Sequence, residues 1–183
     1  MKSYLDIVRN VLDNGFLQPN RTGVSAYTIP GAMFSHDMAD GFPLLTTKRV
    51  PFGLVASELE FFIKGLTDKR WLQERNNHIW DEWCSPGELL EVDASEVKSR
   101  MKHERNLGPI YGWQWRRFGE STSGIIDGRI GYDQLYRVVL ALKESPESRR
   151  MLVSAWNPMD LHRMALPPCH FAWQVTVVNS KLN

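Results

Sequence analysis

The sequence predicts an α+β fold in which helices pack against a mixed or mainly antiparallel sheet. Apolar residues recur at helical spacing in segments such as 4–12 and 135–142. In residues 170–178, by contrast, large apolar residues alternate with smaller or polar ones, which is typical of a strand with one buried face. The sequence contains no repeat, low-complexity tract or linker, so we expect a single domain over residues 1–183.

Composition narrows the class of protein. A chain of 183 residues, 43% of them hydrophobic, can bury roughly 70% of its unfolded surface in one core. No apolar run approaches the roughly 20 residues of a membrane-spanning helix, and the N-terminus resembles no signal peptide, so we expect a cytoplasmic protein with no membrane partner. The net charge of +1 argues against DNA as a partner. Cys84 and Cys169 match no metal-ligand spacing, which predicts free thiols and no metal.

The first elements follow from periodicity and glycine signals. Residues 4–12 are predicted to form an amphipathic helix that stops before Asn14-Gly15 and buries its apolar stripe in the core. Residues 20–45 are rich in Thr, Val, Tyr and Ile and are interrupted by glycine and proline. This composition predicts short strands joined by turns.

Two further helices are expected in the next segment. One should cover about residues 51–64 and end at Gly65. The other should cover about 68–75, with Thr67 or Asp68 as its cap.

The second half of the chain alternates between surface and core patterns. Residues 85–106 are charged and poor in aromatic residues, so we expect a surface insertion that carries one short helix. An amphipathic helix is predicted over 135–142, before Pro146. Two strands should follow, over 150–156 and 170–178.

Glu58 is a carboxylate on the apolar face of the helix predicted over 51–64. That face is formed by Leu54, Val55, Leu59 and Phe62. One interpretation is a structural acid whose hydrogen-bond partners are backbone or arginine. The other is a proton-transfer group, because burial raises a carboxyl pKa toward neutral pH, and the sequence favours this second interpretation.

Cys169 follows Pro167-Pro168 at the start of the last predicted strand. A free cysteine is often a small core residue, so burial is one hypothesis. Arg149 and Arg150 precede the neighbouring strand and suggest another hypothesis, in which they lower the thiol pKa and bind a phosphate. An arginine pair on its own is more often solvated surface charge.

Three aromatic residues are candidate binding groups. Trp80 and Trp83 flank two acids, a spacing that presents both indoles on one side of a turn, either as core or as a stacking platform for a flat heterocycle. Tyr111 lies between Gly108 and Gly112, from where its hydroxyl can reach a polar cavity.

Taken together, these segments resemble thymidylate synthase over the whole chain except the insertion. The motifs that carry the resemblance occur in the family's order: Asn20-Arg21-Thr22-Gly23, Phe42-Pro43-Leu44-Leu45-Thr46-Thr47-Lys48-Arg49, Glu58-Leu59, Ile79-Trp80-Asp81-Glu82-Trp83, Leu107-Gly108-Pro109-Ile110-Tyr111-Gly112, Ser148-Arg149-Arg150, Ser154-Ala155-Trp156-Asn157-Pro158 and Met164-Ala165-Leu166-Pro167-Pro168-Cys169-His170.

The resemblance implies a reaction and a role for each catalytic candidate. It implies that Cys169 adds to C6 of deoxyuridylate (dUMP), and that 5,10-methylenetetrahydrofolate supplies a one-carbon unit and a hydride to make dTMP. It further implies that Glu58 and Tyr111 belong to the proton-transfer network around the pyrimidine. Trp80 and Trp83 would line the folate side.

The resemblance also implies a symmetric homodimer. Arg21 would bind the phosphate of dUMP, while Arg149 and Arg150 would reach across the interface to the nucleotide of the other subunit.

Two alternatives remain open from the sequence. Glu58-Leu59-Glu60 is similar to the corresponding segment of deoxynucleotide hydroxymethylases, sister enzymes that use dUMP or dCMP and finish with water rather than hydride. The thymidylate synthase pattern also continues beyond the cysteine strand, so we expect the chain to be incomplete at its C-terminus and to have little activity alone. The second alternative is a genuinely short, non-catalytic product that complements a second fragment or dimerises with a full-length subunit.

Overall fold

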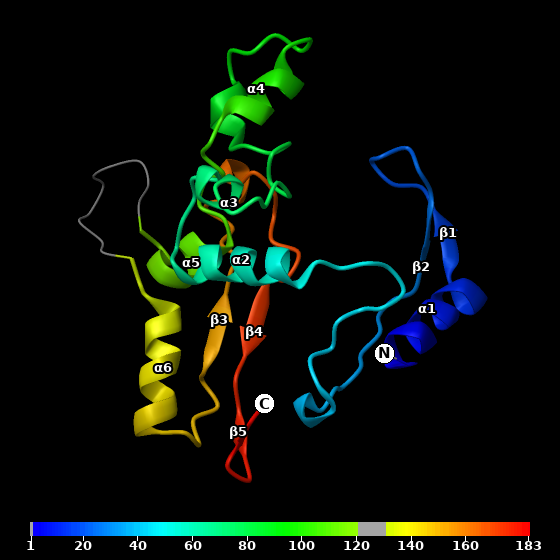
Figure 1. The fold of residues 1–183 in the computed structure, drawn as a ribbon, viewed down its shortest axis with the longest axis vertical. Coiled ribbons are helices and arrows are strands. Elements are labelled where there is room, and N and C mark those ends of the chain that lie inside the picture. The colour runs from blue at the N-terminus through cyan, green and yellow to red at the C-terminus, as the bar shows by residue number, and fades with distance from the viewer. Residues whose placement is uncertain (1, 121–130) are drawn as a thin grey trace. The chain divides into compact units, whose positions relative to one another are not determined.

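The computed structural model describes residues 2–120 and 131–183 and confirms the α+β class. The elements are α1 (Lys2–Asn14), β1 (Phe16–Gln18), β2 (Ala26–Thr28), η1 (Met38–Asp40), α2 (Phe52–Ile63), α3 (Arg70–Gln73), η2 (Pro86–Leu89), α4 (Val97–His103), α5 (Tyr111–Arg117), α6 (Gln134–Glu144), β3 (Leu152–Ser154), η3 (Leu161–Arg163), β4 (Ala172–Gln174), β5 (Val177–Val178) and β6 (Lys181–Leu182) (Figure 1).

Within the described ranges, the strands pair antiparallel as β1–β2, β3–β4 and β5–β6. None of the helices placed there combines the length and apolar character that crossing a bilayer requires. The chain forms two compact units, Met1–Phe52 and Gly53–Asn183. The expectation of a single domain stays a prediction.

The first unit contains the predicted N-terminal helix and a two-stranded ribbon. Helix α1 ends as expected, where the Gly15 N–H donates to the Val11 carbonyl at 2.9 Å. The prediction that its apolar stripe is core is wrong, because α1 has no buried residue and Leu12 is 63% exposed. The reason is size: one helix, a short ribbon and η1 supply too little apolar surface to enclose a helix face.

The core of the second unit is built around aromatic side chains of α2 and α5. The buried cluster comprises Phe61, Phe62, Leu72, Trp80, Leu107, Ile110, Tyr111, Trp115, Val138, Met151, Val153, Ala155 and Met164. Helix α2 matches its predicted range, but its face is rotated, since Phe61 and Phe62 are buried whereas Val55 and Leu59 are exposed. Glu58 lies one turn before Phe61 and Phe62, so it remains on the face that turns toward the core.

The sequence did not predict helix α5, which begins at Tyr111. It packs main chain against main chain on α2: a Cβ added at Gly112 would lie 2.5 Å from the Phe62 carbonyl oxygen and 2.7 Å from its Cα. A glycine inside a helical pattern lowers the helix propensity, which hid the element. Here the missing side chain is what allows the two helices to approach.

Buried polar side chains lock α5 to the rest of the second unit. The Gln114 amide donates to the Asp160 carboxylate at 2.8 Å and to the Pro109 carbonyl at 3.0 Å. From α6, the Gln134 amide donates to the carbonyls of Gln114 and Ser154, both at 2.8 Å. These bonds fix Tyr111 relative to β3.

Helix α6 and the β3–β4 ribbon form the other side of this unit. Figure 1 shows α6 beside β3, with β4 on the far side of β3. The predicted strand over 170–178 is divided into β4 and β5, and its alternation holds only in part. Trp173 and Val175 pack on the core, whereas Phe171 is exposed.

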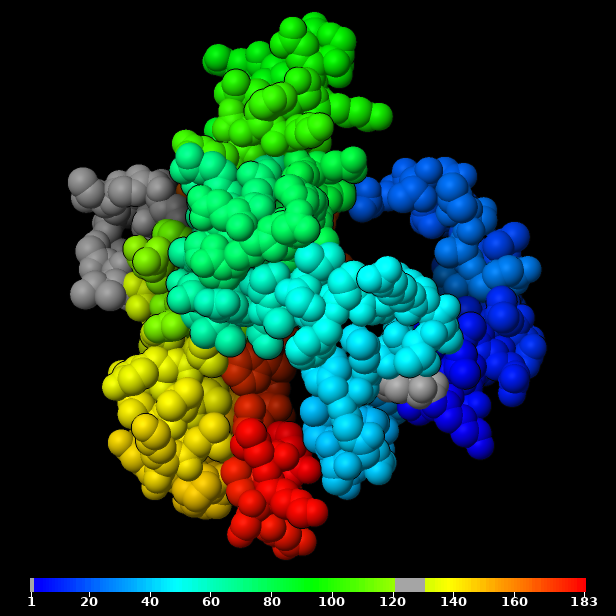
Figure 2. Space-filling view, viewed as in Figure 1, coloured from blue at the N-terminus to red at the C-terminus, as the bar shows by residue number. Residues whose placement is uncertain are grey.

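Residues 85–106 project from the second unit as a lobe that carries η2 and α4 (Figure 2). At its base, Asp68 and Asn106 form an antiparallel bridge, and the Lys69 N–H donates to the Arg105 carbonyl at 3.0 Å. Helix α3 begins at Arg70, directly after Lys69, and is shorter than the predicted range 68–75. Asp68 nevertheless acts near its start, since its carboxylate accepts from the Arg70 N–H at 3.0 Å.

Candidate active site

The candidate active site is centred on the ring of Tyr111, at the N-terminus of α5. His170 stacks on this ring with 4.1 Å between centroids and 21° between planes. The ring centroids of Phe62 and Trp80 lie 4.7 Å and 6.3 Å from the Tyr111 ring centroid. The phenol is therefore held by aromatic neighbours from α2, the turn after α3 and the segment before β4.

Cys169 is exposed and joined to Tyr111 by a hydrogen bond. Its backbone N–H donates to the Tyr111 Oη at 2.8 Å, and its thiol is free. The preceding Pro168 is buried and anchors the approach to this position. The hypothesis of a core cysteine is therefore wrong for Cys169, whereas Cys84 is buried and free.

Burial raises the pKa of the Tyr111 phenol. The nearby Cys169 thiol and Glu58 carboxyl raise it further, whereas the hydrogen bond from the Cys169 N–H lowers it. At neutral pH the phenol keeps its proton, because even an unperturbed tyrosine titrates near 10. It can therefore donate a hydrogen bond while it orients the cysteine.

Glu58 is half-buried and accepts a hydrogen bond from the Trp80 indole N–H at 2.8 Å. Burial raises the pKa of the carboxyl, and the bond from Trp80 partly opposes this shift. The partner is thus an indole, not the backbone or arginine that a purely structural acid was expected to have. A carboxyl whose pKa moves toward neutral is suited to exchanging protons.

The two tryptophans lie on a turn before the lobe and differ in exposure. Trp80 is buried in the aromatic cluster, so the core interpretation holds for it. Trp83 packs only partly buried against the core and keeps part of its ring accessible. Of the pair, Trp83 is the one that offers a surface to a ligand.

The arginine pair lies away from Cys169. In the β3–β4 register Ser154 pairs with Ala172 near the cysteine end, and Leu152 pairs with Gln174 near the other. Arg149 belongs to that other end, where its carbonyl accepts from the Gln174 amide at 3.0 Å. The arginines therefore do not adjoin the thiol of their own chain, contrary to the hypothesis that they lower its pKa.

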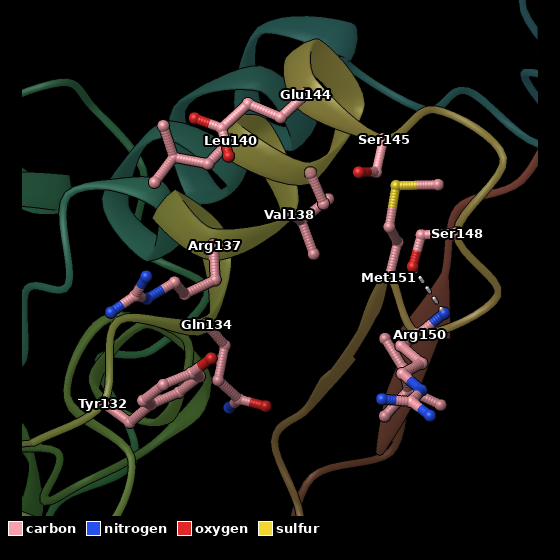
Figure 3. A pocket seen from close by; sticks show the side chains of 12 residues that line it. Tyr132, Gln134, Arg137, Val138, Leu140, Glu144, Ser145, Ser148, Arg150 and Met151 are labelled. Carbon is pink, nitrogen blue, oxygen red and sulfur yellow. Dashed lines mark hydrogen bonds between the residues drawn. The ribbon is translucent and has the colours of Figure 1, made fainter.

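Arg150 instead lines a cavity of about 390 Å³ between α6 and the start of β3. Arg137 of α6 also lines it, and the Ser148 hydroxyl accepts from the Arg150 N–H at 3.2 Å (Figure 3). Arg21 belongs to the first unit, in the turn after β1, and is exposed. The expected phosphate contacts of the three arginines stay predictions.

The sequence did not single out His170 or Lys69. His170 is exposed as a residue, but desolvation of its ring against aromatic neighbours lowers its pKa, which favours the neutral imidazole. Its position beside Cys169 was the available signal. The burial of Lys69 was not predictable from the sequence, because lysines in polar segments are normally exposed to solvent.

Together, these residues place an exposed thiol beside a phenol and a raised-pKa carboxyl. Among the residues that the structure describes, His, Cys, Asp and Glu do not gather in groups of three that could hold a metal ion. A thiol in such a place can act as a nucleophile, and the phenol and the carboxyl are groups that can exchange protons. A family model described as thymidylate synthase matches residues 2–183.

Proposed function

The chain belongs to the thymidylate synthase family, whose members bind dUMP and a folate, and from this premise we propose that it converts dUMP to dTMP with 5,10-methylenetetrahydrofolate. The observation that carries the proposal is the hydrogen bond from the Cys169 N–H to the Tyr111 Oη, with the thiol exposed beside it. A nucleophile needs access to the substrate and a fixed position, and this contact holds the main chain that carries the exposed thiol.

The chemistry proposed for Cys169 is reversible covalent addition. The thiolate sulfur forms a bond to C6 of the pyrimidine, and the electron pair of the C5–C6 double bond moves toward C5 and the O4 carbonyl. C5 would then bond to the one-carbon unit and lose its proton, and the bond between that unit and the folate nitrogen would break. A hydride from the folate would complete the methyl group while the C5–C6 double bond reforms and the Cys169 thiolate leaves, so that the enzyme is unchanged.

Glu58 and Tyr111 are proposed to carry protons during these steps. Burial holds the pKa of Glu58 above its ordinary range, so a fraction of the carboxyl remains protonated closer to neutral pH. The Cys169 thiol and the Glu58 carboxyl both affect the pKa of the Tyr111 phenol, so the three groups are electrostatically coupled. We assign these groups to proton movement at the pyrimidine, through direct contact or ordered water.

The folate, when bound, supplies a one-carbon unit and a hydride. The residues that would hold it are Trp83, which is only partly buried, and Trp80, which belongs to the buried cluster against which Trp83 packs. The Trp80 indole N–H also donates to the Glu58 carboxylate, so the same residue would link the folate side to the acid.

A homodimer is proposed for phosphate binding. Arg149 and Arg150 are exposed and lie at the end of the β3–β4 ribbon away from Cys169, which supports a role in the site of another subunit. Arg21 would contribute to the same phosphate, as a cation with bidentate geometry. A cytoplasmic setting, in which thiols stay reduced, suits a free catalytic cysteine.

The test is turnover by the purified protein at its native length. dUMP and 5,10-methylenetetrahydrofolate are supplied, and the nucleotide product is identified by mass. Formation of dTMP supports the proposal, a hydroxymethylated nucleotide replaces it with the sister reaction, and no consumption of dUMP refutes both.

The matched variants are Cys169→Ala and Cys84→Ala. The first removes the exposed thiol and should abolish turnover. The second removes a buried thiol of the same chemistry and should leave turnover close to wild type. Activity that survives Cys169→Ala would rule out the covalent mechanism.

A further inference from the structure

We propose that Lys69 is a positioning residue, whose buried ammonium group holds the main chain of residues 81–83 and thereby orients Trp83 toward the folate. This inference rests on the proposed function. Residues 79–84, which contain both tryptophans, are called the tryptophan turn below. Lys69 precedes α3 and contacts none of the reacting groups, so any effect on catalysis passes through this turn.

The geometry of Lys69 is unusual for a lysine. The residue is 1% exposed, and its Nζ donates to the carbonyls of Asp81 at 2.8 Å, Trp83 at 2.8 Å and Met101 at 2.6 Å. An ammonium group has three protons, so every donor is satisfied by main chain. Two of the acceptors belong to the tryptophan turn and bracket residues 81–83.

The bonds from Lys69 supply donors to two carbonyls of the tryptophan turn. Asp81 N–H donates to His78 and Trp83 N–H donates to Trp80, which closes two tight bends but commits only donors of those residues. Their carbonyls point inward, where a carbonyl without a partner is costly. The ammonium of Lys69 satisfies both carbonyls. It thereby fixes the peptide plane between residues 81 and 82 and the plane between residues 83 and 84, which enclose Glu82 and Trp83.

The third acceptor couples the turn to the lobe. Met101 lies in the last turn of α4, where helix carbonyls lack helical partners. A cation at that end of a helix is favourable, and Lys69 provides it. One side chain therefore joins the tryptophan turn to the lobe of residues 85–106.

Burial of the Lys69 ammonium carries a desolvation cost, which nearby groups partly offset. Burial lowers the pKa of the Lys69 ammonium, while Cys84, Asp81 and Glu104 act against that shift. A buried cation is weak evidence for stability, because an apolar side chain of similar volume avoids the desolvation cost. What an apolar side chain does not supply is the set of three directed donors.

The inference predicts a selective defect. Cys169 and Tyr111 lie on the segment before β4 and on α5, which Lys69 does not contact through its ammonium. Loosening the tryptophan turn should therefore weaken folate binding while binding of dUMP is retained. A residue needed only for folding would affect both substrates together.

The experiment compares Lys69→Met and Lys69→Gln with Arg70→Met in the protein at its native length. Methionine keeps the volume and removes all donors, whereas glutamine keeps two. Arg70 is the matched control, an exposed cation of the next position that pairs with Asp68. We expect Lys69→Met to raise KM for 5,10-methylenetetrahydrofolate about tenfold, with KM for dUMP within about twofold, and Lys69→Gln to fall between. Arg70→Met should change neither constant.

A second measurement needs no turnover. Amide hydrogen exchange of the tryptophan turn should be faster in Lys69→Met than in Arg70→Met, and dUMP should still bind. Unchanged exchange, or equal increases in both KM values, would overturn the inference. If the wild-type protein does not consume dUMP, the proposed function fails, while the exchange data still decide whether Lys69 holds the turn. If Lys69→Met does not fold, Lys69→Gln carries both measurements.

Discussion

Replacing Tyr111 with phenylalanine removes one oxygen atom from the centre of the candidate site. The ring that stacks on His170 and packs on Phe62 is kept, so the aromatic cluster should remain. What is lost is the acceptor of the Cys169 N–H at 2.8 Å, together with a hydroxyl near the thiol. The variant therefore isolates the role of the oxygen from that of the ring.

The magnitude follows from that single bond. A partly buried N–H left without an acceptor costs about 1–3 kcal/mol. If the whole cost appears in the barrier to addition by Cys169, kcat falls between about 5-fold and 150-fold. KM for dUMP should change much less, since phosphate binding is assigned to arginines away from the phenol.

Two measurements test this reasoning. Steady-state kinetics give kcat and KM, and amide hydrogen exchange reports on the Cys169 N–H, which should exchange faster in Tyr111→Phe. Tyr136→Phe is the control, because Tyr136 is an exposed tyrosine on α6. A Tyr111→Phe variant with wild-type kcat and unchanged exchange at Cys169 would refute the role of the bond.

Three further predictions concern charge, access and packing. Because burial raises the pKa of Glu58 above the unfolded value of about 4.3, the folded state loses stability as pH rises from that value through the raised pKa. Glu58→Gln should lack this loss, so denaturant unfolding of the two proteins across acidic to neutral pH should diverge, and parallel curves would contradict the shift. In the native protein an alkylating reagent should modify Cys169 and spare Cys84, with both modified in denaturant, as mass spectrometry of peptides will show; equal native reactivity would count against the burial of Cys84. Gly112→Ala forces a Cβ into the main chain of α2 and should destabilise the protein by at least about 2 kcal/mol. Gly53→Ala, in the same pair of helices but with open space around it, should be neutral or stabilising, and thermal melts that rank the two variants equally would disprove the close contact.

Local periodicity was sufficient for the helices whose own sequence marks both ends. Helices α1, α2 and α6 occur as predicted because apolar spacing and terminal residues are properties of the segment itself. Helix α5 was missed because Gly112 lowers its helix propensity, and the reason for that glycine lies on α2, far away in the sequence. Likewise, burial of α1 was predicted from its stripe alone, although burial depends on how much apolar surface the neighbouring elements supply.

The site was predictable to the extent that its residues carry their chemistry locally. Cys169 after two prolines and Glu58 on an apolar face were singled out from the sequence. In the structure the Cys169 thiol is exposed and burial raises the pKa of the Glu58 carboxyl, while their catalytic roles stay predictions. The placement of Arg149 and Arg150 was not predictable, because the strand register decides which end of the ribbon they occupy. Lys69 escaped because only the fold shows where its ammonium is directed.

The direct contact between α2 and α5 at Gly112 limits how this site can diverge. Glu58 and Tyr111 are carried by two helices whose main chains touch, so any side chain added at Gly112 forces the helices apart and costs stability. The cysteine segment and the tryptophan turn are held through side chains and can be retuned one residue at a time. Changes in substrate or cofactor preference should therefore accumulate in those two segments, while the distance between the proton carriers is inherited unchanged.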